Sequence, residues 1–354
     1  MTPGDTRASS SGTHTTKLVA CSAIVYVVWG SSYLATSVGV HNLPPRLFSG
    51  IRFVIAGMLL LGLARALGRR PVLDASELRH TLVVSCCTIL LSNGFNNWAM
   101  QWVPSNQAAL LNASSALWIA AFGTFGRRAH ALSARVAAGL ALGFVGLVLV
   151  LDLPAGATVR SGLLVPQLAI LTGCIAWSLG TIYFRNVGTQ LDLLSFTGAQ
   201  MLFGGLALVG LGAGFGDFAH WHWSARGMIA MGYLTIASSC ITYIAYGWLA
   251  RNASPAQTGT FGYVNPAIAA LLGWLVLGER LTPSQVLGMA VVLGGVVLVS
   301  WPSTPSRRQR LGPPTHDEID APARTDEPRA DPSGNTHDDR GEKRGPEPAQ
   351  VKAG

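Results

Sequence analysis

Ten apolar runs of roughly 20 residues follow one another along residues 18–301. A helix of about 20 apolar residues crosses the ~30 Å hydrocarbon core of a bilayer, whereas a membrane barrel would show strands of about 10 alternating residues. The pattern therefore predicts an all-α integral membrane protein with ten transmembrane helices. We expect the spans at 18–38, 47–67, 81–100, 105–125, 134–151, 163–183, 193–213, 227–249, 256–277 and 286–301.

The last five runs repeat features of the first five at a shift of 148 to 150 residues. Trp29 corresponds to Trp177 and Trp98 to Trp248. Because five spans is an odd number, the second half must enter the membrane from the opposite face. Two inverted five-helix repeats are the plan of many secondary transporters, whose substrate site lies near the midplane between the repeats. Further pairs with this offset are Phe48-Ser49-Gly50 with Phe196-Thr197-Gly198, Gln107 with Gln257, and Gly139 with Gly288.

The repeats and the polar segments around them define the expected domain organisation. A polar cytoplasmic N-terminus over 1–17 precedes the first repeat over 18–151, and an outer linker over 152–162 leads to the second repeat over 163–301. Residues 302–354 are rich in Pro, Asp, Glu, Arg, Ser and Thr and hold few large apolar residues. Such a segment cannot bury enough apolar surface to offset its chain entropy, so we expect a disordered cytoplasmic tail.

Composition and charge agree with a lipid environment. The chain is 12% charged, against about 25% in soluble domains, and its mean hydropathy is +0.38. With the N-terminus inside, eleven Lys and Arg residues before the tail fall on the inner side and four on the outer side. The positive-inside rule then places both termini in the cytoplasm. The net charge of +8 reflects this topology, so we expect a lipid bilayer and a small-molecule substrate as partners, and no nucleic acid.

Several short motifs occur in a fixed order at the ends and centres of these spans. They are Trp29-Gly30-Ser31-Ser32, the stretch Leu47-Phe48-Ser49-Gly50-Ile51-Arg52-Phe53, Asn265-Pro266, and Gly278-Glu279-Arg280-Leu281-Thr282. With them, residues 18–301 resemble the EamA-type transporters of the drug/metabolite transporter superfamily. The resemblance implies a ten-helix carrier of the plasma or inner membrane that exports amino acids, nucleobases, other metabolites or toxic compounds.

The chain departs from this family at one turn. The family often has Gly-Glu between the fourth and fifth helices of both halves, but here the first half reads Gly126-Arg127-Arg128 and the second keeps Gly278-Glu279. An acid at this turn is therefore not expected to be an essential, symmetric coupling group.

Arg52 is the ionisable residue that lies well inside an expected span. A charge at this depth costs about 2.5–3.5 kcal/mol on insertion scales, so such residues face protein or a watery cavity and are functional candidates. Its repeat mate is Gln200, and an arginine fork with a supporting amide could bind a substrate carboxylate. The structural alternative is that Arg52 extends to the nearby interface or pairs with helix carbonyls.

Aromatic, hydroxyl and amide residues on corresponding spans complete the candidate substrate site. Bare amides facing lipid would each cost several kcal/mol, so they must point toward other helices or the transport pathway. Hydrogen bonding between helices is the structural alternative for each of them. Pro266 removes a backbone donor mid-span, so Tyr263 and Asn265 are candidate site or hinge residues. The other candidates are Trp29, Ser31, Ser32, Asn93, Asn97, Trp177, Tyr243 and Tyr246.

These features favour an exporter of amino-acid-like or other carboxylate-bearing metabolites that works by alternating access. An exporter of drugs or toxic compounds is the first alternative, although no carboxylate lies near the midplane to exchange protons against a lipophilic cation. A membrane enzyme or scaffold is the second, but the sequence has no catalytic motif, and His220 and His222 make a poor metal pair. We therefore expect no enzyme activity, cofactor or metal. The small-residue spacing Gly139 to Gly143 favours helix packing, with homodimerisation as an alternative.

Overall fold

The computed structural model describes residues 5–69, 74–122, 134–151, 162–253 and 261–300, and these residues form helices and connecting turns without a strand. The predicted tail, the linker up to residue 161 and the Gly-Arg-Arg turn of the first half lie outside the described residues.

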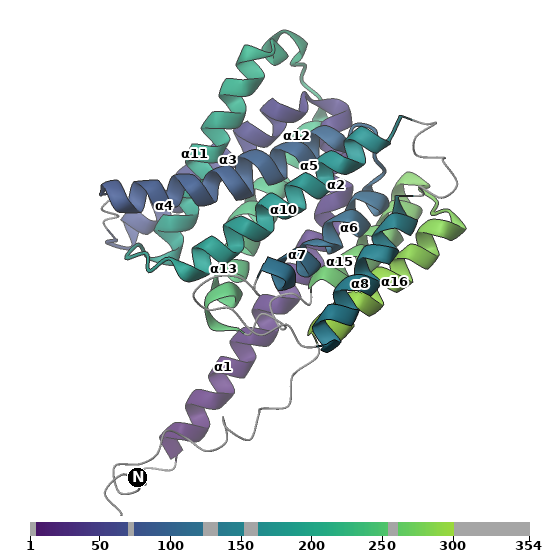
Figure 1. Cartoon of the computed structure of the whole chain (residues 1–354). Coiled ribbons are helices and arrows are strands. Elements are labelled where there is room, and N and C mark those ends of the chain that lie inside the picture. Colours follow the sequence, from purple (N-terminus) through teal and green to yellow (C-terminus); the bar gives the residue numbers. More distant parts are fainter. Residues whose placement is uncertain (1–4, 70–73, 123–133, 152–161, 254–260, 301–354) are drawn as a thin grey trace, which may run out of the picture. The chain divides into compact units, whose positions relative to one another are not determined.

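The described helices coincide with the apolar runs, except that the first helix begins at Asp5, within the predicted polar N-terminus. Figure 1 shows their arrangement. Several spans are composed of more than one helical segment, because short π-helical stretches (η1, η2, η4 and η5) interrupt the α-helical hydrogen bonding. The elements of the first half are α1 (Asp5–Ile24), η1 (Val25–Trp29), α2 (Gly30–Asn42), α3 (Pro45–Ala66), α4 (Ala75–Ser85), η2 (Cys86–Asn93), α5 (Gly94–Ala99), α6 (Ser105–Ala113), α7 (Ser115–Phe122) and α8 (Ala134–Val150). Those of the second half are α10 (Leu164–Asn186), α11 (Leu193–Gly214), the 3-10 turn η3 (Asp217–His220), α12 (Ala225–Tyr233), η4 (Leu234–Thr242), α13 (Tyr243–Asn252), α15 (Phe261–Leu272), η5 (Gly273–Leu277) and α16 (Pro283–Ser300).

Five of these helical stretches are long and apolar enough to cross a bilayer by themselves. Shorter apolar helices cover the fifth, ninth and tenth predicted spans, and α6 and α7 divide the fourth at Ser114. The all-helical membrane architecture is thus confirmed. The five long stretches are Thr15–Asn42, Pro45–Ala66, Leu164–Asn186, Leu193–Gly214 and Ala225–Asn252.

The second and seventh predicted spans, α3 and α11, make one of the two most extensive helix contacts among the described residues. Gly50 lies against the carbonyl of Gly205, and Gly57 against that of Gly198. A Cβ atom on Gly57 would come 2.6 Å from the backbone nitrogen of Leu202. Glycine therefore lets two backbones touch, and the order of the contacts shows that the helices run antiparallel.

The fifth and tenth predicted spans, α8 and α16, lie side by side in the same way (Figure 1). Gly146 packs against Gly288, while Gly295 approaches the backbone of Gly139 and Gly143. The Gly139 to Gly143 spacing thus serves helix packing within the chain, and homodimerisation stays a prediction. In both pairs, helices at equivalent repeat positions cross antiparallel, as an in-plane two-fold axis between two repeats requires.

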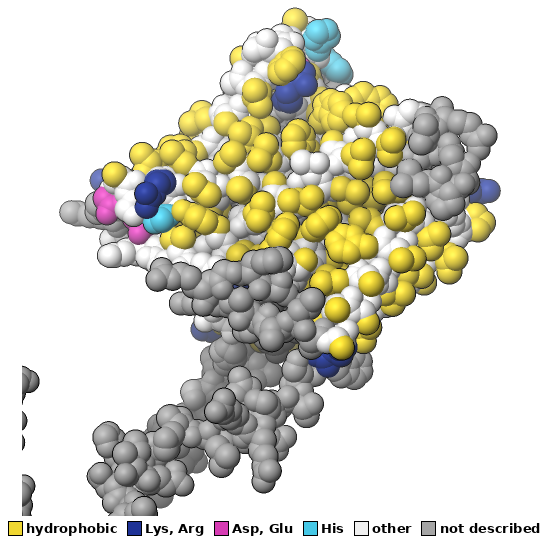
Figure 2. Space-filling model, in the orientation of Figure 1, with side chains coloured by type: hydrophobic (Ala, Val, Ile, Leu, Met, Phe, Trp, Pro, Cys, Tyr) yellow, Lys and Arg dark blue, Asp and Glu magenta, His cyan; other side chains and the backbone are white. Residues whose placement is uncertain are grey.

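Charged side chains gather at the ends of the helices, and an apolar belt separates them (Figure 2). Arg46 pairs with Asp217 at 2.6 Å near one end of α3, and Arg69 pairs with Asp192 near the other. Asp192 also caps the first turn of α11, where its carboxylate accepts from Ser195. Burial raises the pKa of this carboxyl, but hydrogen bonds from Ser195 and Arg69 outweigh burial and hold the pKa below its usual range.

Glu279, the acid of the Gly-Glu turn, caps a helix of the other half. Its carboxylate accepts hydrogen bonds from Ser105 N at 2.8 Å, Ser105 Oγ at 2.8 Å and Asn106 N at 3.0 Å. These groups begin α6, whose first N–H groups have no partner within the helix. Gly278, at φ +68°, makes the turn that brings the acid there. The turn thus joins the end of the ninth span to the start of the fourth.

Glu279→Gln should destabilise the protein, because an amide NH2 group would face the N–H donors that now bind a carboxylate. Ser105 and Asn106 are buried, so an unsatisfied donor costs about 1–3 kcal/mol. The melting temperature in detergent should fall, while Arg280→Gln, at the exposed neighbouring position, should leave it unchanged. Equal melting temperatures for both variants would contradict this role.

Candidate functional site

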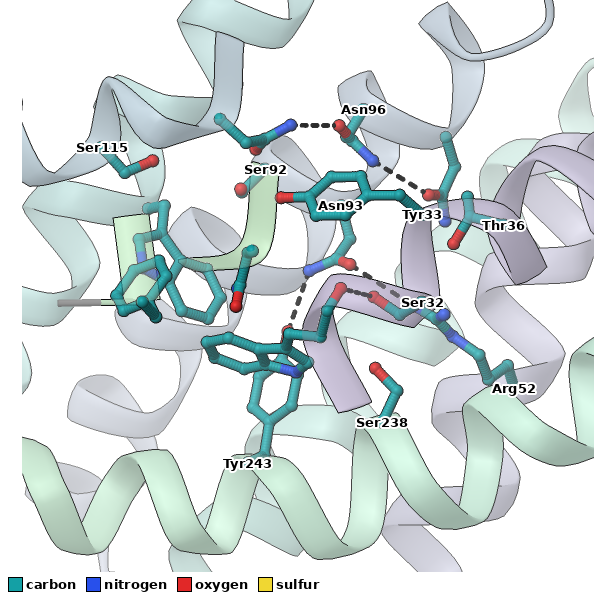
Figure 3. A pocket seen from close by; sticks show the side chains of 16 residues that line it. Ser32, Tyr33, Thr36, Arg52, Ser92, Asn93, Asn96, Ser115, Ser238 and Tyr243 are labelled. Carbon is teal, nitrogen blue, oxygen red and sulfur yellow. Dashed lines mark hydrogen bonds between the residues drawn. The ribbon is translucent and has the colours of Figure 1, made fainter. Parts of the chain in front are cut away.

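A cavity of about 100 Å³ lies among helices of both halves (Figure 3). This volume holds several water molecules or a small solute. We call it the Arg52 cavity. It is lined by Trp29, Ser32, Tyr33, Thr36, Arg52, Ser92, Asn93, Asn96, Asn97, Asn112, Ser115, Trp177, Ser238, Tyr243, Phe261 and Asn265.

Interrupted helices position many of these side chains. The π-helical segment η1 ends at Trp29, η2 carries Ser92 and Asn93, and η4 carries Ser238. The break at Ser114 lies beside Ser115 at the start of α7. A π-helical turn widens the helix by one residue and often occurs at functional sites, because it redirects side chains from their regular positions.

Arg52 brings a buried cation to this cavity. The side chain is 4% exposed, its Nη2 donates to Asn93 Oδ1 at 3.3 Å, and its Cζ lies 4.3 Å from the centre of the Phe53 ring. The Nε atom is buried without a hydrogen-bond partner. None of the 16 lining residues is Asp or Glu. The guanidinium is therefore neither at the surface nor balanced by a carboxylate in the cavity wall.

An amide network adjoins the guanidinium (Figure 3). Asn93 Nδ2 donates to Tyr243 Oη at 2.9 Å and to the carbonyl of Thr88 at 2.7 Å. Asn112 Nδ2 donates to Asn96 Oδ1 at 2.7 Å. These bonds join three spans and fix the direction of the Asn93 carbonyl toward Arg52. These asparagines therefore do both of the things predicted for them: they join helices by hydrogen bonds, and they line the cavity.

Five aromatic rings form one cluster beside the cavity. The centre of the Trp29 ring lies 5.6 Å from that of Trp177, 5.6 Å from Tyr243, 5.0 Å from Tyr246 and 5.7 Å from Phe261. The contacts with Trp177, Tyr243 and Phe261 are edge-to-face and that with Tyr246 is tilted. Edge-to-face contacts at these distances contribute about 0.5–1.5 kcal/mol each beyond simple burial. The rings of the cluster come from both halves of the chain, and four of them line one side of the cavity.

Asn265 on α15 adds an acceptor. Its side chain is 4% exposed and lines the cavity, and its Oδ1 atom is buried without a partner. The cavity therefore presents an unpaired donor, Arg52 Nε, and an unpaired acceptor, Asn265 Oδ1. Buried polar groups are nearly always hydrogen-bonded, so two exceptions in one cavity fit a site whose partner is a solute.

Eight of the twelve predicted site residues line this cavity. Two others, Gln200 and Tyr246, line a second cavity described below. Ser31 lines neither, because its hydroxyl donates to Val27 O at 2.7 Å and contacts Tyr233 Oη at 2.6 Å. The side chain of Tyr263 lies outside the described residues. The eight are Trp29, Ser32, Arg52, Asn93, Asn97, Trp177, Tyr243 and Asn265.

Sequence reasoning missed several lining residues. Asn112 is an amide inside an expected span, and that signal alone would have made it a candidate. Tyr33 and Thr36 follow Ser32 by one and four positions, so helical spacing could have added Thr36 to the same face. Phe261 carries no polar signal, and its place in the aromatic cluster could not be read from the sequence.

Comparisons with known proteins agree with this architecture. The EamA-like transporter family matches residues 17–152 and 165–301. The inner membrane transporter YedA of Escherichia coli K12, itself uncharacterized, is 32% identical over 284 residues, which cover 78% of this chain and 88% of YedA. The uncharacterized transporter YoaV of Bacillus subtilis is 20% identical over 80% of this chain and 96% of its own length. Protein PecM of Dickeya dadantii is 25% identical over 81% and 93%.

A protein of known crystal structure shares the fold, with a TM-score of 0.60 and 18% identity over 80% of this chain and 97% of that protein. The family model matches the chain twice, once in each half. The two matched segments also coincide with the two sets of spans that the helix packing relates. The chain belongs to the EamA-like transporter family.

Proposed function

We propose that this protein carries small carboxylate-bearing solutes, amino acids above all, out of the cell across the inner membrane. In this proposal the ten spans form two inverted five-helix repeats with both termini in the cytoplasm. The repeats rock about a central site and expose it to each face in turn. The antiparallel packing of α3 with α11 and of α8 with α16 supports the inverted arrangement.

The observation that carries the proposal is the buried guanidinium of Arg52. A buried cation needs an anionic partner or several acceptors, and the described residues supply one amide carbonyl and one aromatic ring. A carboxylate entering the cavity would supply the missing charge and could accept from Nε. The arginine therefore favours an anionic group on the solute.

The unpaired acceptor extends the argument to amino acids. Asn265 Oδ1 can accept from an ammonium or hydroxyl group, and the faces of Trp29 and Phe261 can contact a cation as well. A zwitterion would satisfy both unpaired groups at once. The same features disfavour the alternative of lipophilic cation export, because a fixed positive charge in the wall repels a cationic drug.

A thermal-stability screen of the detergent-purified protein tests this proposal. A ligand that binds the folded state stabilises it by RT ln(1 + [L]/Kd), about 2.7 kcal/mol at 100 times Kd. L-alanine, L-lactate and L-alaninol are matched probes, because they are nearly equal in size and differ in one charged group. We expect higher melting temperatures with L-alanine and L-lactate and no change with L-alaninol. Stabilisation by L-alaninol or cationic dyes alone would overturn the solute class.

A further inference from the structure

A second cavity, of about 40 Å³, also adjoins the aromatic cluster, and Trp177, Tyr243 and Tyr246 are among its lining residues. Trp177 and Tyr243 line both cavities, so their rings separate the two. We call the second the Gln200 cavity. Besides the shared rings its wall includes Gln200, Thr181, Tyr246 and Thr197, and it is much less polar than that of the Arg52 cavity.

The two cavities are built from equivalent positions of the two repeats. Gln200 is the repeat mate of Arg52, and Thr181 that of Tyr33. Across the halves, Tyr246 is the mate of Asn96. At shifts of 148 or 150 residues, nine of the 16 residues that line the Arg52 cavity have their repeat mate in the wall of the Gln200 cavity. Two cavities formed independently would have no reason to use matching positions.

Arg52 and Gln200 also lie toward opposite ends of the contact between α3 and α11. Arg52 is the eighth residue of α3 and Gln200 the eighth residue of α11, so each lies in the first half of its 22-residue helix. Because α3 and α11 run antiparallel, the beginnings of these helices lie at opposite ends of their contact. A solute that leaves the Arg52 cavity through the aromatic cluster would therefore enter the Gln200 cavity on the way to the other membrane face.

We propose that the Gln200 cavity is the second station for the transported solute, opening to the membrane face opposite the one served by the Arg52 cavity. This inference rests on the proposed function. In the second station an amide replaces the guanidinium, so a carboxylate meets a hydrogen-bond donor without a charge. Charge-assisted hydrogen bonds are roughly twice as strong as neutral ones, so the solute is held on the Arg52 side and released on the Gln200 side.

Cysteine accessibility tests the two stations without any knowledge of the solute. Thr36 lines the Arg52 cavity and Thr181 the Gln200 cavity, and both are buried. Each is replaced by cysteine in a full-length background whose five native cysteines are changed to serine or alanine. Thr235→Cys is the matched control, because Thr235 is equally buried and lines neither cavity. A membrane-impermeant methanethiosulfonate is added to right-side-out and inside-out vesicles.

We expect Thr36→Cys to react about tenfold or more faster from one face, since minor conformers are populated at about 0.1–10%. Thr181→Cys should react from the opposite face, and Thr235→Cys from neither. Reaction of Thr36→Cys and Thr181→Cys from the same face, or no reaction of Thr181→Cys from either, would overturn the proposal. Ser92→Cys and Thr197→Cys replace the first pair if either fails to fold.

The two proposals can fail separately. If none of the carboxylate probes stabilises the protein but the two cysteines react from opposite faces, the solute class is wrong and the two stations stand. If the probes stabilise the protein but Thr181→Cys reacts from neither face, the proposal for the Arg52 site stands and that for the second station is wrong.

Discussion

Arg52→Ala is expected to abolish stabilisation by L-alanine and L-lactate while leaving the unliganded protein as stable as before. Hydrogen bonds to charged groups contribute about 1.5–3 kcal/mol each, which corresponds to roughly 10- to 150-fold weaker binding for one lost bond. The Kd from thermal-shift titration of the purified variant is the measurement. Transport of the same probes into proteoliposomes should fall as binding weakens.

The stability of unliganded Arg52→Ala separates a functional arginine from a structural one. Removing one partner of a buried ion pair strongly destabilises a protein, but Arg52 has no carboxylate partner in its cavity wall. Its removal relieves the cost of burying a charge, so the melting temperature should stay the same or rise. A melting temperature several degrees lower, with unchanged affinity for the probes, would show that Arg52 is structural.

Arg52→Lys and Arg52→Gln divide the effect into charge and geometry. Lysine keeps the charge but not the planar fork, so we expect partial binding of the carboxylate probes. Glutamine is the residue found at the equivalent position 200, and it keeps a hydrogen-bond donor without the charge. The affinity of Arg52→Gln for the carboxylate probes should therefore be closer to that of Arg52→Ala. Equal binding by all three variants would show that the guanidinium does not contact the solute.

The part of the candidate site that the sequence predicted consists of residues whose side chains cost free energy to expose to lipid. Arg52, Asn93 and Asn97 could be found because charges and amides inside an apolar span need a reason to be there. Phe261 and Tyr33 carry no such cost, so only the folded chain brings them into the wall. Side chains that line a cavity through shape alone leave no signal in a single sequence.

The repeat offset was informative about the fold but misleading about the site. It paired Arg52 with Gln200, and the structure places these two residues in different cavities. A two-fold axis sends repeat mates to opposite sides unless the residue lies near the axis. Trp29 and Trp177 do lie near such an axis, since the centres of their rings are 5.6 Å apart. Periodicity shows that two halves are alike, and packing decides which mates meet.

Helix breaks were the other feature that the apolar pattern could not supply. Hydropathy predicts that a segment crosses the bilayer. It is the same whether each carbonyl accepts from the N–H four residues ahead, as in an α-helix, or five residues ahead, as in a π-helix. The stretch from Ala75 to Ala99 is continuous, yet η2 shifts the register between α4 and α5 and so sets the directions of Asn93, Asn96 and Asn97. The positions of these amides were predictable, and their common direction was not.

Gly57→Ala and Gly205→Ala should each lower the melting temperature markedly, because the added methyl group meets backbone rather than a movable side chain. A Cβ atom added at Gly57 would lie 2.6 Å from Leu202 N, and one added at Gly205 would lie 2.6 Å from Val54 N. Overpacking of this kind costs about 1–3 kcal/mol. Unfolding followed by heat in detergent gives the comparison with the parent protein.

Matched controls lie on the same two helices. A Cβ atom at Gly62 of α3 or Gly210 of α11 would meet no atom within 4 Å, so alanine there should be neutral or stabilise the helix by up to about 1 kcal/mol. The double variant of Gly57 and Gly205 should lose less than the sum of its single effects, because one outward shift of the helices relieves both clashes. Equal losses at all four sites would mean that alanine disturbs these helices regardless of close packing.

The same contact controls both cavities, which extends the prediction from stability to binding. Arg52 lies on α3 and Gln200 on α11, so a wider separation of these helices moves the guanidinium away from Asn93 and the aromatic cluster. Gly57→Ala and Gly205→Ala should therefore weaken binding of L-alanine even at temperatures where both variants are fully folded. Gly62→Ala and Gly210→Ala should bind it as the parent does. If the two destabilised variants bound L-alanine with parental affinity, the close approach of α3 and α11 would serve stability alone and not the geometry of the site.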